Sequence, residues 1–311
     1  MSASHKVETT FKSFTKDQGA NYAAHRSPYD TKVYDLIIQH HTATGGHLTT
    51  LVDVGCGPGG ATRELAKHFA SAIGLDASEG MIATAQSLLT DDQTSKKITF
   101  RVGGAEDLPG IEAGSVDLLT AATAAHWFDM PRFWASAARV LKPGGTVAIW
   151  CVCGSRIDPA KTPNGAAIQA FGEKFDDEVL GPFQEPGSKH PRSYYRDLVL
   201  PWSTAVTEKS VVDDAFDEKT FYRKEWKGET DGDYLVQLPT LTLDVSEKIL
   251  STASSIIRWR DAHPDKVGTE EDVLKVWRRG VEELLYEAGV EKGKELINGG
   301  VGGVLLMVKR T

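Results

Sequence analysis

The feature that most constrains this chain is the stretch LVDVGCGPGGATREL, residues 51–65. An apolar run with strand character leads into a turn that contains four glycines, and a helical pattern follows it. Backbone amides at a strand-to-helix turn are unpaired donors, and glycine lets a ligand approach them because no Cβ stands in the way. The stretch therefore predicts a strand–turn–helix unit of an open α/β sheet that holds a ligand at its turn.

Strand-like runs alternate with helical patterns up to about residue 150, which is typical of a parallel sheet with crossover helices. Apolar residues recur at helical spacing over 29–40, so a helix is predicted before the first strand. The predicted strands are 50–54, 72–76, 98–103, 116–122 and 146–151. We therefore predict an α/β fold with a doubly wound, Rossmann-like and mostly parallel sheet.

The alternation stops after Cys153, where prolines and glycines become frequent. Helical patterns reappear at 246–259 and 270–285, and the apolar run 301–309 is compatible with a last strand of the main sheet. The predicted organisation is a ligand-binding core over 1–153, an inserted and mainly helical cap over 154–290, and a return to the core over 291–311.

Composition and charge exclude several classes of partner. With 35 Lys and Arg against 43 Asp and Glu the formal net charge is −8, so no global basic field recruits nucleic acid or a membrane. The N-terminus lacks the apolar core of a signal peptide, and the three cysteines show no metal-ligand spacing. We expect a cytoplasmic protein without a bound metal, and a monomer because no exposed apolar heptad is evident.

Acidic residues occupy the positions where a nucleoside would be recognised. Asp53 lies inside the first predicted strand, where a buried carboxylate is costly unless donors satisfy it. The Asp53 carboxylate either orients the turn toward a ligand or only accepts hydrogen bonds from the turn's own amides. Asp76 ends the second strand, where a ribose-binding carboxylate follows such a turn, and Ala105, Glu106 and Asp107 follow the third strand, where an acid can accept from an adenine amino group.

The glycine spacing by itself leaves a second ligand open. Glycines at 55, 57 and 60 also fit the G-x-G-x-x-G turn of a dinucleotide site, so a dinucleotide-dependent oxidoreductase is an alternative. A carboxylate at Asp53 would repel a pyrophosphate, however, and it favours a ligand that carries an amino group and ribose hydroxyls.

Five motifs together resemble the class I S-adenosylmethionine-dependent methyltransferases: LVDVGCGPG, IGLDASEGMI, GGAEDLP, SVDLLTAATAAHWFD and VLKPGGTVAIW. More narrowly, AAHWFD, AIW, GPFQEPG and IIRWR resemble the fungal trans-aconitate methyltransferase family, whose members methylate a carboxylate of a small tricarboxylic acid. The resemblance implies S-adenosylmethionine as the cofactor, O-methylation of a small polycarboxylic acid as the reaction, and an N-terminal lid in NYAAHRSPYD. The implied cofactor contacts are Tyr22 and Arg26 in the lid, Asp53, Gly55 and Gly57 at the methionine part, Asp76 at the ribose, Met81, Ala105, Glu106 and Asp107 at the adenine, and Ala122 at the sulfonium.

The acceptor pocket would begin at His126 and Trp127, directly after the fourth strand. A carboxylate acceptor is already an anion at pH 7 and needs no base, whereas for a hydroxyl acceptor His126 is the best-placed general base. Arg192, Arg196 and Arg258 belong to a local basic set that could grip an anionic acceptor bidentately, or they are a solvated cap surface. The alternatives are O- or C-methylation of a secondary-metabolite acceptor, and a cofactor-binding protein without methyl transfer.

Overall fold

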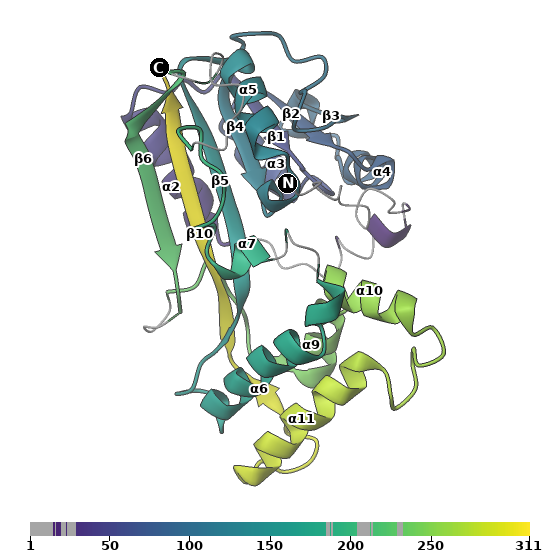
Figure 1. The fold of residues 1–311 in the computed structure, drawn as a ribbon. Helices are drawn as coiled ribbons and strands as arrows, with labels where there is room; N and C mark the ends of the chain where they lie inside the picture. Colours follow the sequence, from purple (N-terminus) through teal and green to yellow (C-terminus); the bar gives the residue numbers. More distant parts are fainter. Residues whose placement is uncertain are drawn as a thin grey trace, which may run out of the picture.

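The structure, a computed structural model, describes residues 15, 17–19, 23, 29–184, 187, 189–203, 212, 214–228 and 233–311. Two lobes follow one another in Figure 1: a sheet lobe built around the central sheet, and a helical lobe below it. Two long strands run from the first lobe into the second (Figure 1). No helix in the described ranges is long and apolar enough to cross a membrane.

The central sheet has the order β3-β2-β1-β4-β5-β10-β6, with β7 paired to β10. The first five strands of this order are parallel, whereas β10 is antiparallel to both β5 and β6. The predicted Rossmann-like, mostly parallel sheet is therefore confirmed. Its strands are β1 (Thr50–Val54), β2 (Ser71–Asp76), β3 (Ile98–Val102), β4 (Val116–Ala122), β5 (Leu141–Ile157), β6 (Phe216–Trp226), β7 (Val236–Gln237) and β10 (Gly299–Arg310).

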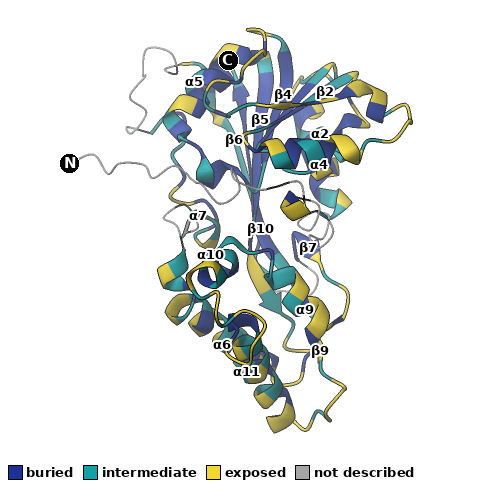
Figure 2. Ribbon diagram, turned by 90° about the vertical axis from the view of Figure 1, so that its right-hand side faces the viewer, coloured by how far each residue is buried: buried dark blue, intermediate teal, exposed yellow. Residues whose placement is uncertain are grey.

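Side chains of the central strands are buried on both faces, as β5 illustrates. Val147 and Ile149 belong to one apolar cluster and Ala148 and Trp150 to the other, because successive residues of a strand point to opposite faces. Figure 2 shows these strands as the buried centre of the sheet lobe. The covering helices are α5 (Met130–Val140) on one face, and α2 (Thr31–Ala43), α3 (Gly60–Ala66) and α4 (Glu79–Ser87) on the other.

The predicted strand boundaries differ most at β5 and β10, which are both longer than the apolar runs 146–151 and 301–309. The two strands pair from Thr146↔Lys309 to Ile157↔Gly299, with a register shift between Val301 and Gly303. The polar and glycine-containing ends were not predicted because the partner strand, rather than an apolar pattern, satisfies their backbone groups.

The helical lobe is built mainly from segments between these two strands. Its elements are α6 (Gly165–Glu178), η3 (Gly181–Phe183), α7 (Lys189–Arg192), α9 (Leu243–Leu250), α10 (Ser254–Ala262), α11 (Val273–Glu287), and the pair β8 (Leu241–Thr242) and β9 (Leu296–Ile297). The helix predicted over 246–259 is divided into α9 and α10. The Ser251 and Thr252 hydroxyls donate to the Lys248 and Ile249 carbonyls, and such side-chain bonds compete with the helical ladder.

The predicted cap 154–290 differs from the structure in its strands. Strands β6 and β7 lie inside that range but pair with β10 of the central sheet, β6 at the sheet's edge. The cap is therefore interrupted by a return to the sheet lobe. The sequence FDEKTFYRKEW of β6 is rich in charged residues, because an edge strand is exposed along one side.

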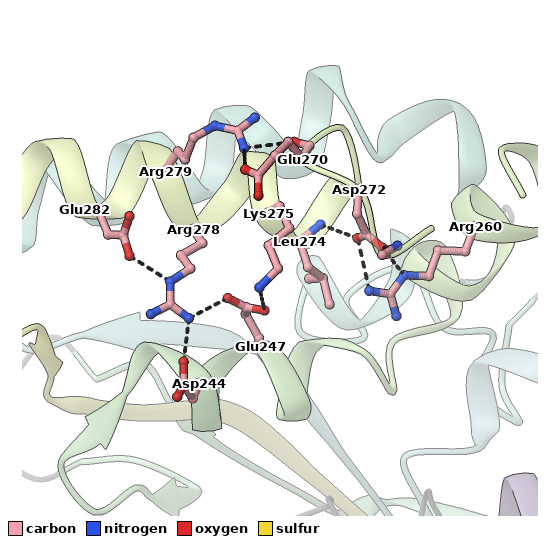
Figure 3. A network of polar contacts seen from close by, with 11 residues as sticks. Asp244, Glu247, Arg260, Glu270, Asp272, Leu274, Lys275, Arg278, Arg279 and Glu282 are labelled. Atoms are coloured by element: carbon pink, nitrogen blue, oxygen red, sulfur yellow. Dashed lines mark hydrogen bonds and ion pairs between the residues drawn. The ribbon is translucent and has the colours of Figure 1, made fainter. Parts of the chain in front are cut away.

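Ion pairs join the helices of the helical lobe, as Figure 3 shows. Arg278 of α11 pairs with Asp244 and Glu247 of α9 and with Glu282 of its own helix. At the start of α11 the Asp272 carboxylate, only 2% exposed, accepts from Arg260 at 3.0 and 3.1 Å. Asp272 also accepts from the backbone amides of Gly268 and Leu274, so one buried carboxylate both caps α11 and holds α10.

We expect Asp272→Ala to lower the free energy of unfolding by about 3 kcal/mol, because Arg260 loses its buried partner and α11 loses its cap. The measurement is denaturant unfolding followed by circular dichroism. Glu270→Ala is the matched control, since Glu270 pairs with Arg279 but is 88% exposed, and its loss should cost less than about 0.5 kcal/mol. Equal effects of the two substitutions would contradict the assigned role.

Candidate functional site

The glycine turn between β1 and α3 has the open backbone that its sequence predicts. Gly55, Gly57 and Gly59 have positive φ angles of 63°, 53° and 78°, a region that other residues rarely adopt. A Cβ at Gly55 would lie 2.5 Å from the Cβ of Ala124, so the turn packs closely against the segment after β4. At Gly57 no described atom lies within 4 Å of the position of a Cβ, which leaves this part of the backbone open.

Asp53 is fully buried beneath the turn and is not part of the wall of the cavity described below. Its two carboxylate oxygens accept from the hydroxyls of Thr62 in α3 at 2.6 Å and Thr120 in β4 at 2.7 Å. Burial, with a contribution from nearby Asp76, raises the pKa of Asp53 to about 6. Asp53 therefore fastens β1, α3 and β4 together through hydroxyl groups rather than through the turn's own amides.

Asp76, at the end of β2, faces the turn and lines the cavity described below. One of its oxygens accepts from the Gly57 amide and the other from the Ser78 amide, both at 2.8 Å. The carboxylate is half-buried. It thus lies at the carboxyl edge of the sheet next to the glycine turn, where the sequence predicts it.

One continuous cavity of about 1290 Å³ extends from the glycine turn to the helical lobe. Of the predicted cofactor contacts, its wall includes Gly55, Gly57, Asp76, Met81, Ala105, Glu106 and Ala122. Asp107 is not part of the wall, because its side chain is exposed to solvent. The predicted lid contacts Tyr22 and Arg26 lie outside the described residues.

His126 and Trp127 both line this cavity, in the short helix η2 (Ala125–Trp127). The His126 side chain is buried, with its ring centroid 4.6 Å from that of Trp127. Its Nδ1 atom lies 2.7 Å from the hydroxyl oxygen of Tyr195. The predicted start of the acceptor pocket therefore lies between the glycine turn and the helical lobe.

The three predicted substrate arginines lie in different environments. Arg192 lines the cavity and forms ion pairs with Asp176 and Asp177 of α6. Arg196 lies off the wall, where its guanidinium pairs with Glu225 of β6 at 2.8 Å. Arg258 also lies off the wall, with its Nε donating to the Phe183 carbonyl at 2.6 Å. The structure does not bring these arginines together, because each one is held by a different partner.

Several wall residues have no counterpart in the predicted site. Arg63, on the first turn of α3, donates from Nη1 to the Pro58 carbonyl at 2.8 Å. Arg156, in β5, also lines the cavity, and its Nη1 lies 3.9 Å from the Glu173 carboxylate oxygen Oε1. Tyr195 lies next to His126 but off the wall, and it has no counterpart in the predicted site either. No local pattern distinguishes these residues, since each acquires its position through contacts distant in sequence.

The described residues contain no cluster of three or more His, Cys, Asp and Glu suited to a metal ion. The glycine turn and the adjoining cavity can hold a ligand that carries an amino group and ribose hydroxyls. The rest of the cavity can hold a second molecule beside His126. This arrangement suits transfer of a group between two bound molecules.

Comparison with known proteins agrees with this arrangement. A family described as "Methyltransferase domain" matches residues 52–149. A Dictyostelium discoideum protein described as a methyltransferase is 32% identical over 209 residues, which cover 66% of this chain and 71% of that protein. A Saccharomyces cerevisiae protein described as an S-adenosylmethionine-dependent methyltransferase is 33% identical over 133 residues, 43% of this chain and 45% of that protein.

The fold also matches a solved structure over most of its length. The structure of a type II methyltransferase from Anaeromyxobacter dehalogenans superposes with a TM-score of 0.58, at 22% identity, covering 92% of this chain and 96% of that one. At this identity the likeness concerns the fold alone. The sequence match to the yeast relative spans less than half of that protein's length, whereas the match to the Dictyostelium relative spans more than two thirds.

The buried Asp53 carboxylate should make stability depend on pH in a predictable direction. Its pKa is about 6 in the folded protein and 3.8 in the unfolded chain, so the folded state binds the extra proton between these values. Stability from this group therefore falls as pH rises from about 4 to 6 and then levels off. Asp53→Asn removes this dependence. When the pH is raised from 5 to 7.5, we therefore expect the free energy of unfolding of the variant to rise by about 1–2 kcal/mol relative to that of the wild type.

Denaturant unfolding at the two pH values measures this difference. Asn is a close substitute because its amide can face both threonine hydroxyls, each of which donates or accepts. Asp91→Asn is the control, since Asp91 is 95% exposed and pairs only with Lys96 among the described residues. A difference between Asp53→Asn and wild type that does not vary with pH would contradict the raised pKa.

Proposed function

The chain belongs to the S-adenosylmethionine-dependent methyltransferases, and we propose that it methylates an oxygen of a small, largely apolar acceptor that lies beside His126. One observation carries the proposal: a single cavity joins the glycine turn, His126 and an apolar wall supplied by the helical lobe. The cofactor and the acceptor can then lie side by side in the same cavity, without a rearrangement of the protein.

The residues around the turn fit the cofactor. Gly57 presents open backbone, and the Asp76 carboxylate beside it can accept from two ribose hydroxyls. The Met81 thioether and Ala105 offer apolar contacts to an adenine ring. Arg63 forms no ion pair with the described residues and can bind the carboxylate end of the cofactor. When bound, S-adenosylmethionine supplies a methyl group on a positively charged sulfur.

We expect Asp76→Asn to weaken binding of S-adenosylhomocysteine by roughly 10- to 100-fold, because hydrogen bonds to a charged acceptor are worth about 1.5–3 kcal/mol. Isothermal titration calorimetry measures the affinity. Asp35→Asn, an exposed substitution on α2, should leave it within about twofold. If Asp76→Asn binds S-adenosylhomocysteine as tightly as the wild type does, Asp76 does not bind the ribose. If the wild-type protein binds NADH instead of S-adenosylhomocysteine, the result favours the alternative of a dinucleotide-dependent oxidoreductase.

The acceptor's environment follows from the helical lobe. The apolar part of the wall includes Ile168, Phe175, Leu180, Ile256, Leu274 and Trp277. An aromatic or aliphatic acceptor buries apolar area here, which is worth roughly 25 cal/mol per Å². Closure of the cavity around such a molecule also excludes water from the reacting oxygen. For a hydroxyl acceptor His126 takes the proton, and for a carboxylate acceptor it only orients the oxygen.

A second candidate is the polycarboxylate acceptor that the sequence resemblance implies. Arg156 and Arg192 in the cavity wall favour it, because guanidinium groups bind carboxylates well. Both arginines already lie beside carboxylates, however: Arg156 is 3.9 Å from Glu173, and Arg192 pairs with Asp176 and Asp177. A tricarboxylate would have to displace these partners and would meet their negative charges. The apolar acceptor therefore has the stronger support.

The acceptor class can be tested with labelled S-adenosylmethionine and a panel of trans-aconitate, citrate, isocitrate, neutral phenols and apolar monocarboxylic acids. We expect methyl transfer to phenols or apolar monocarboxylates, because they match the apolar wall. Transfer only to polycarboxylates would overturn the apolar acceptor and support the second candidate. Cofactor binding without transfer to any acceptor would favour a protein that retains the fold without turnover.

Arg192→Met sharpens the same test. With an apolar acceptor the KM should change by less than about threefold, because the acceptor makes no ion pair with Arg192. With a polycarboxylate the KM should rise more than about tenfold, since loss of one ion pair at a partly buried site costs at least about 1.4 kcal/mol. Arg196→Met is the matched control, because Arg196 pairs with Glu225 away from the cavity.

A further inference from the structure

Tyr195 contacts His126 from the side that faces away from the cavity. Its side chain is 1% exposed and is not part of the cavity wall formed by the described residues, whereas His126 is. The Tyr195 hydroxyl lies 2.7 Å from His126 Nδ1, and Trp127 packs against the histidine ring. Among the described residues no hydrogen bond is found at Nε2. The ring nitrogen left for the cavity is therefore Nε2.

The backbone that carries Tyr195 is strained. Tyr194 and Tyr195 have φ angles of 55° and 57°, and consecutive non-glycine residues rarely adopt this left-handed region. Each costs roughly 1 kcal/mol or more, and such strain persists only where surrounding contacts impose it. Here the Tyr195 amide donates to the His190 carbonyl at 2.9 Å and the Tyr194 amide to Pro191 at 3.0 Å. The fold thus maintains an unfavourable backbone that directs the Tyr195 hydroxyl toward His126.

The Tyr195 hydroxyl is suited to accept a hydrogen bond from His126. Burial raises the pKa of Tyr195 well above its ordinary value, so the phenol keeps its proton. A protonated phenol oxygen still has a lone pair, so at 2.7 Å it can accept from Nδ1–H. The Cys151 Sγ of β5, in the same buried cluster as Tyr195, donates to the Val152 carbonyl at 3.1 Å.

We propose that Tyr195 is a positioning residue for His126: it accepts from Nδ1–H, fixes the imidazole ring, and leaves Nε2 as the proton acceptor that faces the methyl acceptor. The inference rests on the proposed function for the identity of the group that Nε2 meets. With a hydroxyl acceptor, the proton passes to Nε2 and the oxygen keeps the electron pair that bonds to the methyl carbon. The carbon–sulfur bond breaks as that bond forms, so charge and atoms balance.

The tautomer of His126 tests this inference without methyl transfer. Nitrogen chemical shifts of the wild-type protein, bound to S-adenosylhomocysteine and carrying labelled histidine, report which ring nitrogen bears the proton. The His126→Asn variant assigns the signal by its loss. We expect Nδ1–H to predominate in the wild type, and Tyr195→Phe to shift the population toward Nε2–H. A wild type with Nε2–H would overturn the proposal even if Tyr195→Phe failed to fold.

Kinetics with a hydroxyl acceptor test the same coupling. Tyr195→Phe should lower kcat about 10- to 100-fold with the KM for S-adenosylmethionine within twofold, and it should add less than twofold in the His126→Asn background. Tyr194→Phe is the matched control, because it removes a hydroxyl from the neighbouring strained residue while leaving the Tyr195 hydroxyl in place; we expect activity within twofold of wild type. Independent, multiplicative losses from Tyr195 and His126 would contradict positioning.

The two experiments separate failure of this inference from failure of the proposed function. If no acceptor is methylated, the proposed function fails, and the histidine tautomer still decides the role of Tyr195. If methyl transfer occurs but neither His126→Asn nor Tyr195→Phe changes kcat, the methyltransferase stands and the positioning role is overturned.

Discussion

The antiparallel pairing of β5 with β10 is the interaction on which the arrangement of the site depends. The paired strands extend from Thr146↔Lys309 in the sheet lobe to Ile157↔Gly299 at the helical lobe. One end belongs to the sheet whose edge carries the glycine turn, and the other end leads into the helices that supply the apolar wall (Figure 1). Because every backbone group of a ladder must find a partner, the pairing holds the glycine turn and the apolar wall at a set separation.

The parts of the site that the sequence predicts are those whose position depends on local rules. A strand that ends in Gly55 and Gly57 must turn there, and an acid at Asp76 must lie at the same edge because parallel strands end together. The extents of β5 and β10 follow from their mutual pairing, which no single-strand pattern shows. The division of the predicted helix 246–259 follows from side-chain hydrogen bonds of Ser251 and Thr252.

The charges of the cap show why a list of basic residues does not identify an anion site. In the sequence, Arg192 and Arg196 stand four residues apart and suggest a shared helical face. In the structure α7 ends at Arg192, so the shared face does not form, and the two side chains find separate carboxylates, Asp176 and Glu225. Each carboxylate partner of the two arginines lies at least 15 residues away in the chain. The positive charge that the sequence displays is thus compensated by tertiary contacts.

Compensation of the arginines and the position of His126 together restrict the chemistry of the acceptor. Toward the helical lobe, Arg156 and Arg192 of the wall already lie beside carboxylates. Apolar contact is then the main source of affinity for an acceptor there, and such contact does not orient a particular atom. Orientation must then come from a few polar groups at the reacting end. Among the residues that the structure describes there, His126 has a buried hydroxyl, that of Tyr195, behind it. A ring held by Tyr195 at one nitrogen presents only the other, so a single hydrogen bond can select which acceptor oxygen meets the methyl group.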